Sequence, residues 1–393
     1  MIPPKALGQA LWMLGCSLLA LACATPRARS EAEALARTRS TIRAVVRDQQ
    51  LPSVAYLMLD RDGVLLDVTA GRVDAGRSTL ASPRTLYMAY SITKVVTAIA
   101  VLQLVERGAI ELDAPLGRYF RAHPYGPGAT IRRLLAHTAG VPNPAPLDWF
   151  FVEGQPLARQ QALRRVLRDN AQLDGSPGGS YGYSNIGYWL LEKAIEAASG
   201  LDYGAYLQAH VFSPLDVADH EVSFSLPPPE RMATGHIRRM SLSNLVLYLL
   251  APSEYWVDAR DGWSRFARVE GFGRGYGGAF ATAHALGAVL QDLLRDRPVL
   301  LGVESRAMLF ERQRVASGRT LDSSLGWVVD SLDGVEYVGK QGGGLGFQGN
   351  VRIYPTLGLA SVYLANATAL TAGPIDDLSD RLDGPIVRLR AGR

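Results

Sequence analysis

Cysteine is nearly absent from this sequence. Its 393 residues include two cysteines, Cys16 and Cys23, and both lie in the N-terminal 23 residues. The rest of the chain therefore cannot form an internal disulfide, a cysteine-rich zinc site or a thiol nucleophile. The six histidines contain neither an H-E-x-x-H pattern nor a close pair. We therefore expect no metal and no other cofactor.

An excess of one charge is also missing. The chain has 41 basic and 37 acidic residues, a formal net charge of +4, and its basic residues are scattered rather than clustered. Nucleic-acid binding leaves a basic patch or stripe, so we expect no nucleic-acid partner. Hydrophobic residues at 48% and charged residues at 20% exclude a disordered or fibrous chain.

The N-terminal segment contains a long apolar run. Residues 6–24 are almost entirely apolar, and Lys5 precedes them. A positive start, an apolar stretch and small residues at its end are typical of a secretory signal, so we assign residues 1–24 to a signal segment. The run ends at Ala22-Cys23, which resembles a bacterial lipoprotein signal. Plain cleavage at an A-x-A site and a retained helical anchor are the alternatives.

We therefore expect the protein to be exported. The protein would be periplasmic, or attached through a lipid on Cys23 to the outer side of the inner membrane. We further expect it to be a monomer.

Strand patterns stand near both ends of the chain, with helical patterns between them. The expected strands are Val54–Leu59, Val64–Thr69, Leu325–Asp330, Val335–Gly339, Val351–Tyr354 and Ala360–Ala365. An amphipathic helix is expected over 31–49 and a closing helix over 375–390, where Gly384-Pro385 should break or kink the second one.

These elements predict an α+β fold. One antiparallel sheet, flanked by helices, would be built from both chain ends, residues 30–90 and 295–393. Residues 91–294 would be an inserted, mainly helical region, which we expect to be all-α.

The first candidate for chemistry is Ser91-Ile92-Thr93-Lys94, which opens a long apolar run. At a helix start Ser91 and Lys94 are neighbours on one face. A lysine held beside a hydroxyl and partly desolvated can lose its proton and act as a base. The alternative is a serine N-cap with an exposed lysine in the first turn, and for S-x-x-K alone that alternative is favoured. The apolar helix behind Lys94 argues against it.

Two further motifs could complete the site. In Tyr183-Ser184-Asn185, a phenol can exchange protons with a nearby lysine, and an amide two residues later can position both partners. In Lys340-Gln341-Gly342-Gly343, glycines let a substrate backbone approach while Lys340 supplies positive charge. The alternatives are a turn into a helix with packing tyrosines, and a glycine-rich hairpin with a surface lysine.

The order of the three motifs resembles the serine β-lactamase and penicillin-binding-protein superfamily. Because Y-x-N replaces S-D-N, the sequence is similar to the branch of class C β-lactamases, DD-peptidases and family VIII esterases. Residues 131–142, 277–283, 354–355 and 364–366 also match that branch.

This resemblance implies a role for each site residue. Ser91 would be the nucleophile, and Lys94 and Tyr183 the groups that transfer its proton. Asn185, Lys340, Gln341 and Gly343 would bind substrate, and the backbone N–H groups of Ser91 and Gly343 would form the oxyanion hole. Gln341 departs from K-T-G and removes a hydroxyl that β-lactamases use on the substrate carboxylate.

The sequence as a whole predicts an exported serine hydrolase that acts through an acyl-enzyme. Small esters are the first candidate substrates, followed by amides, peptidoglycan-related D-peptides and β-lactams. The alternatives are a D-peptide-specific peptidase, or a penicillin-binding or sensor-type protein that acylates with little turnover. A competing nucleophile pattern, G-x-S-x-G around Ser180, lacks the preceding strand that this pattern requires.

Overall fold

A six-stranded antiparallel sheet is the largest element of the molecule. The computed structural model describes residues 28–146, 148–368 and 375–393. The strand order is β11-β12-β13-β14-β1-β2, so the two chain ends meet in one sheet. This confirms the predicted fold. The strands are β1 (Ser53–Asp60), β2 (Val64–Gly71), β11 (Val328–Leu332), β12 (Val335–Gly344), β13 (Phe347–Tyr354) and β14 (Leu359–Ala365).

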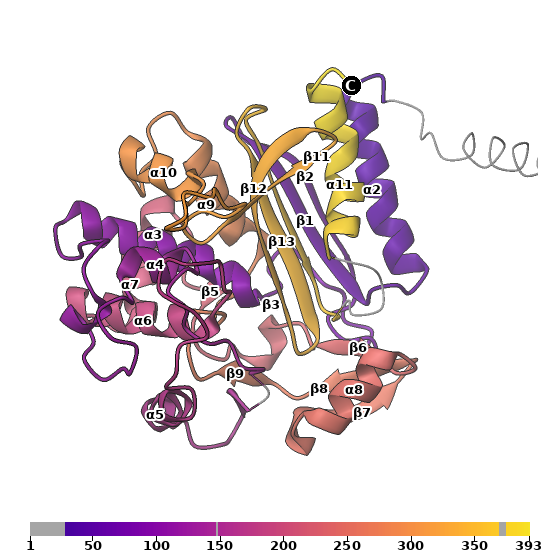
Figure 1. The fold of residues 1–393 in the computed structure, drawn as a ribbon. Helices are drawn as coiled ribbons and strands as arrows, with labels where there is room; N and C mark the ends of the chain where they lie inside the picture. The colour runs from indigo at the N-terminus through magenta and orange to yellow at the C-terminus, as the bar shows by residue number, and fades with distance from the viewer. Residues whose placement is uncertain (1–27, 147, 369–374) are drawn as a thin grey trace, which may run out of the picture.

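The outer face of this sheet is covered by the first and last helices that the structure describes. Helices α2 (Glu31–Arg47) and α11 (Ile375–Arg390) lie side by side there (Figure 1). The side chain of Ser30 caps α2 by accepting the backbone N–H of Glu33 at 3.2 Å. This is the cap expected of a helix that begins near residue 31.

Helix α11 continues through Gly384 and Pro385, so the expectation of a break there is wrong. Tertiary contacts hold the helix on both sides of the proline. The side chains of Leu382 and Ile386 are fully buried against the sheet. The carboxylate of Asp383 accepts hydrogen bonds from the buried hydroxyls of Tyr56 and Tyr354, both at 2.7 Å. The stabilisation from these tertiary contacts therefore outweighs the loss of the helix hydrogen bond that Pro385 cannot donate.

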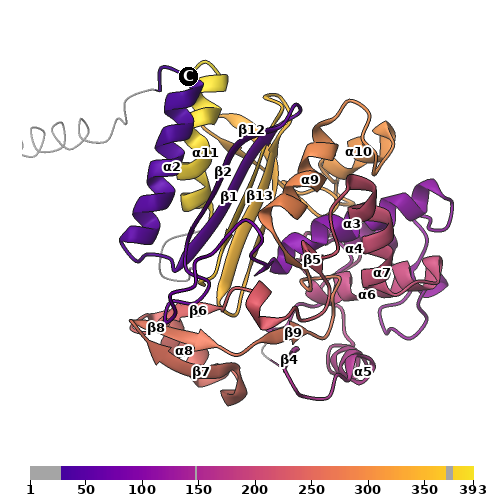
Figure 2. The same cartoon turned by 180° about the vertical axis from the view of Figure 1, so that it is seen from behind.

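The inner face of the sheet carries the central region of the chain (Figure 2). This region is mainly helical, and it also contains three small sheets: β3-β10-β5, β4-β9 and β6-β8-β7. Its last helix, α9, packs directly on β14 and β1. The helices of this region are α3 (Thr93–Glu106), α4 (Ile131–Leu135), α5 (Arg159–Asp169), α6 (Asn185–Ser199), α7 (Tyr203–Leu207), α8 (Leu242–Leu250) and α9 (Ala283–Leu294), and α10 (Val303–Phe310) follows it.

The short strands of the molecule form these three small sheets. They are β3 (Tyr87–Met88), β4 (Phe150–Val152), β5 (Val222–Ser223), β6 (His236–Arg238), β7 (Trp256–Arg260), β8 (Trp263–Phe266), β9 (Val269–Gly271) and β10 (Phe280–Ala281). Every α3 residue from Thr93 to Leu104 is buried, so α3 forms the centre of the larger hydrophobic core. A helix that is apolar on all sides is stable only in such a setting.

The predicted signal segment, residues 1–24 with Cys23, lies outside the described residues. Among the helices of the described part, none is both long and apolar enough to span a bilayer.

Candidate active site

Ser91 lies in a single helical turn, Tyr90–Ile92, that leads directly into α3. The backbone of Tyr90 has φ of +46°, in the left-handed region that a bulky residue rarely adopts. Strand β12 packs closely against this turn. A Cβ atom on Gly342 would lie 2.1 Å from the carbonyl oxygen of Ala89. Glycine at 342 therefore allows the strand to approach the serine, and the strained turn presents the serine to it.

Lys94 is fully buried one turn beyond Ser91. Its ammonium donates to Ser91 Oγ at 3.2 Å, to Asn185 Oδ1 at 2.8 Å and to the carbonyl oxygen of Tyr276 at 2.6 Å. Burial, together with the nearby charge of Lys340, holds the pKa of Lys94 well below its ordinary value. The surface-lysine interpretation of S-x-x-K is thus wrong, because this lysine is enclosed beside the hydroxyl.

The phenol of Tyr183 completes the group around Ser91. Its oxygen lies 2.7 Å from Ser91 Oγ, so the two hydroxyls share a hydrogen bond. Burial raises the pKa of Tyr183 above its ordinary value. The ammonium groups of Lys94 and Lys340 each lie 4.9 Å from the centre of its ring, close enough for cation–π attraction.

The start of helix α6 positions Tyr183 and Asn185. Ser184 caps the helix by accepting the N–H of Gly187 at 3.0 Å, and its own N–H donates to His137 Nδ1 at 3.1 Å. The imidazole of His137 packs under Tyr183 with ring centres 4.5 Å apart. Burial and the charges of the two lysines lower the pKa of His137, so this histidine is neutral. It supports the site from beneath.

Strand β12 brings the third motif to the same place. It continues past Gly339 to Gly344, so Lys340, Gln341 and Gly343 all belong to the strand. Lys340 is buried, and burial lowers its pKa to about 8. Gly343 is exposed, at the register position opposite Gln348 of β13.

A cavity of 330 Å³ opens beside Ser91. The groups near the nucleophile that line it are Ser91, Tyr181, Tyr183 and Lys340, and the remaining ones are Val328, Asp330, Tyr337, Gly339, Gln341 and Asn350. Such a volume suits a small-molecule substrate.

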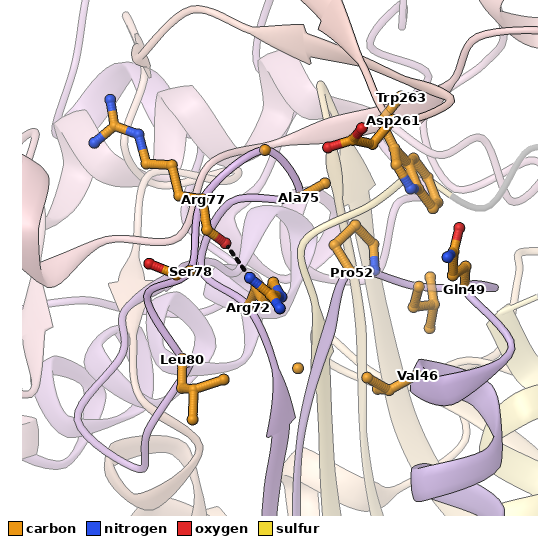
Figure 3. Close-up of a pocket in the computed structure, with 13 residues that line it drawn as sticks. Val46, Gln49, Pro52, Arg72, Ala75, Arg77, Ser78, Leu80, Asp261 and Trp263 are labelled. Carbon is orange, nitrogen blue, oxygen red and sulfur yellow. Dashed lines mark hydrogen bonds between the residues drawn. The ribbon is translucent and has the colours of Figure 1, made fainter.

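A larger cavity of 610 Å³ lies between the end of α2, the Arg72–Leu80 loop and the turn after β7 (Figure 3). Arg72 donates there to the carbonyl oxygen of Arg77 at 2.9 Å. Its lining contains Ser78 but no lysine, tyrosine or histidine, so it lacks the groups that surround Ser91. In the described part of the chain, no group of three histidine, cysteine or acidic residues could hold a metal.

The structure brings Ser91, Lys94, Tyr183, Asn185 and Lys340 together although up to 249 positions separate them in the sequence. Ser180 instead lies exposed in a bend, with no strand before it. Sequence reasoning missed two supporting contacts. These are the Tyr276 carbonyl that binds Lys94 and the side chain of Asn143, which accepts the N–H of Asn185 at 3.0 Å. Neither contact has a motif, since a backbone carbonyl is available at any residue and a single asparagine forms no pattern.

Comparison with protein-family models decides the classification. The model described as "Beta-lactamase" matches residues 38–383. The chain belongs to the beta-lactamase family. The match covers the sheet, α3 and all three motifs.

Two curated proteins show the breadth of this family. The beta-lactamase-family chain is 28% identical over 294 residues, 72% of its length, to "Penicillin-binding protein 4*" of Bacillus subtilis (strain 168). It is 29% identical over 223 residues, 51% of its length, to "Esterase EstB" of Burkholderia gladioli. It spans 60% and 54% of the lengths of these two proteins.

A solved structure supports the same fold. The D-amino acid amidase from Ochrobactrum anthropi SV3, complexed with D-phenylalanine, matches with a TM-score of 0.75 and 18% sequence identity. The match covers 91% of this chain and 99% of that one. At this identity the likeness concerns the fold alone.

Proposed function

We propose that this beta-lactamase-family protein is an exported serine hydrolase that cleaves esters or amides through an acyl-enzyme. The observation that carries the proposal is the pair of contacts at Ser91 Oγ, 2.7 Å to the Tyr183 hydroxyl and 3.2 Å to Lys94 Nζ, beside an open cavity. A hydroxyl between two proton-transferring groups is an activated nucleophile. The esterase named among the similar proteins supports a hydrolase.

In the proposed mechanism Ser91 Oγ attacks the substrate carbonyl as its proton leaves. Lys94 is the favoured base, because its lowered pKa lets it exist without a proton. Tyr183, whose pKa is raised, stays protonated and relays a proton from Lys94 to the leaving group. The N–H groups of Ser91 and Gly343 would hold the oxyanion. Water then attacks the acyl carbon, and Ser91 regains its proton.

Small esters are the leading substrates in this proposal. The penicillin-binding protein among the relatives supports a second candidate, a protein acylated by D-peptides or β-lactams with little turnover. Turnover of a short-chain p-nitrophenyl ester against a chromogenic cephalosporin separates the two. Steady hydrolysis of the ester supports the first function, whereas a single stoichiometric burst supports the second.

Gln341→Thr is expected to raise kcat/KM for a cephalosporin by about 10-fold, with a smaller effect on a neutral p-nitrophenyl ester. Gln341 lines the cavity next to Lys340, and a threonine hydroxyl there could bond the cephalosporin carboxylate. A charge-assisted hydrogen bond contributes roughly 1.5–3 kcal/mol, or about one to two decades in rate. Steady-state kinetics on both substrates provide the test. Equal changes for both would mean that Gln341 affects the shape of the strand instead.

The pH dependence should differ between charged and neutral substrates. Lys340 is protonated below its pKa of about 8 and neutral above it. Its attraction for a substrate carboxylate is therefore present at low pH and lost as the pH rises through about 8. We expect kcat/KM for a carboxylate-bearing ester, relative to its neutral analogue, to fall by about 10-fold or more from pH 6.5 to 9.5.

The titration of Lys94 affects both substrates alike, so it cancels in the ratio of their kcat/KM values. Lys340→Arg, which stays charged over this range, should flatten the ratio. Parallel profiles for the two esters in the unmodified protein would show that Lys340 does not contact the carboxylate.

A further inference from the structure

The cavity beside Ser91 passes around an edge of the sheet. Side chains alternate between the two faces of a strand, and residues directly opposite each other share a face. Lys340 lies opposite Val351, which is buried in the inner core. Gly339 and Gln341 flank Lys340 along β12 and therefore belong to the outer face. The cavity lining includes residues of the inner face and of the outer face, so the cavity extends from one face to the other.

The shape of β12 leaves this passage open. Strand β11 pairs with β12 only as far as Val328 opposite Gly339. From Lys340 to Gly344, no described strand pairs with β12 on the side away from β13. Gly339 contributes no side chain to the outer face. A ligand can therefore lie across the edge with one end near Ser91 and the other on the outer face.

The two ends of the cavity carry opposite charges. Lys340 stands at the end near Ser91, and Asp330 of β11 lies on the outer face, opposite Tyr337. They are the two charged side chains in this lining. Because Tyr337 is three residues from Lys340 along β12, the charges are separated by roughly 10 Å along the strand.

Asp330 differs from the other acidic residues in and around this strand pair. Asp322 and Glu336 form ion pairs with Arg312, and Asp333 forms one with Arg388. Among the described ion pairs, none includes Asp330, whose carboxylate accepts the backbone N–H of Ser331 at 2.7 Å. Its charge is thus available to a ligand in the cavity.

We propose that the outer part of the cavity is a substrate subsite in which Asp330 binds a cationic group, an ammonium or a guanidinium, remote from the scissile carbonyl. This inference rests on the proposed function of Ser91. It narrows the substrate class to esters or amides that carry a positive charge at the far end of an extended chain.

The test compares two substrates of equal length, p-nitrophenyl 8-aminooctanoate and p-nitrophenyl nonanoate, on the full chain. A partly exposed ion pair changes binding by up to about fivefold. We expect the unmodified protein to prefer the amine in kcat/KM by about that factor at low salt, and the preference to decrease as salt rises. Asp330→Asn should bring the ratio of the two kcat/KM values, amine to nonanoate, close to one.

Glu336→Gln is the matched control, since it removes one negative charge from the same strand pair outside the cavity lining. It should keep the preference for the amine. The inference is overturned if the unmodified protein shows no preference, if Asp330→Asn retains it, or if Glu336→Gln loses it equally. Ser91→Ala tests the proposed function separately, because that function requires this variant to lose nonanoate hydrolysis. A failure of the proposed function can therefore be distinguished from a failure of the Asp330 subsite.

Discussion

Ser91→Ala is expected to lower kcat for a short-chain p-nitrophenyl ester by about 10⁴-fold or more. The hydroxyl that contacts both Tyr183 and Lys94 disappears, and no other group in the cavity lining is placed between two proton-transferring residues. Loss of the nucleophile from a serine hydrolase removes nearly all catalysis except that from the oxyanion hole and binding. Initial rates at saturating ester, measured with purified variants, provide the test.

The matched control is Ser180→Ala. Ser180 lies in the competing G-x-S-x-G pattern and is exposed outside the cavity lining. This variant should keep the activity of the unmodified protein. Full activity in Ser91→Ala, or its loss in Ser180→Ala, would contradict the mechanism.

Lys94→Ala and Tyr183→Phe should each lower kcat by about 100-fold or more, the usual size of general acid–base assistance. Both groups contact the same oxygen of Ser91, and the Lys94 ammonium lies 4.9 Å from the centre of the Tyr183 ring. Because they act on one proton, the double variant should lose much less than the product of the single losses. A double-mutant cycle in kcat measures this coupling.

Folding must be checked in the same variants, since Lys94 is fully buried. Thermal unfolding monitored by circular dichroism should show that each variant remains folded at the assay temperature. Strictly multiplicative losses in folded variants would show that Lys94 and Tyr183 act independently, contrary to the proposed relay.

The grouping of the three motifs was predictable from the sequence because each carries its own chemistry. Ser91 and Lys94 are one helical turn apart, so local geometry places them together. The approach of Tyr183 and Lys340 depends on tertiary packing, and the order of the motifs along the chain suggested it only through resemblance to a family. The structure supplies the physical reason, which is the glycine at 342 that lets β12 reach the turn of Ser91.

Other features could not be predicted because they depend on the whole fold. The amino-acid sequence over β6, β7 and β8 does not distinguish short strands from loops, so the central region was expected to be all-α. Pro385 suggests a break when only local propensity is considered, but buried contacts of Leu382 and Ile386 keep α11 continuous. The role of Asp330 also depends on register, because strand pairing alone brings it to the cavity.

The central claim is that Ser91 forms the acyl-enzyme. Its most direct test is mass analysis of the full protein after exposure to a fluorophosphonate and, separately, to a penicillin, followed by peptide mapping. The proposed mechanism predicts a single fluorophosphonate adduct on the peptide that contains Ser91, and the same site for any penicillin adduct. A label on Ser180, or no label on Ser91 in the folded protein, would contradict it.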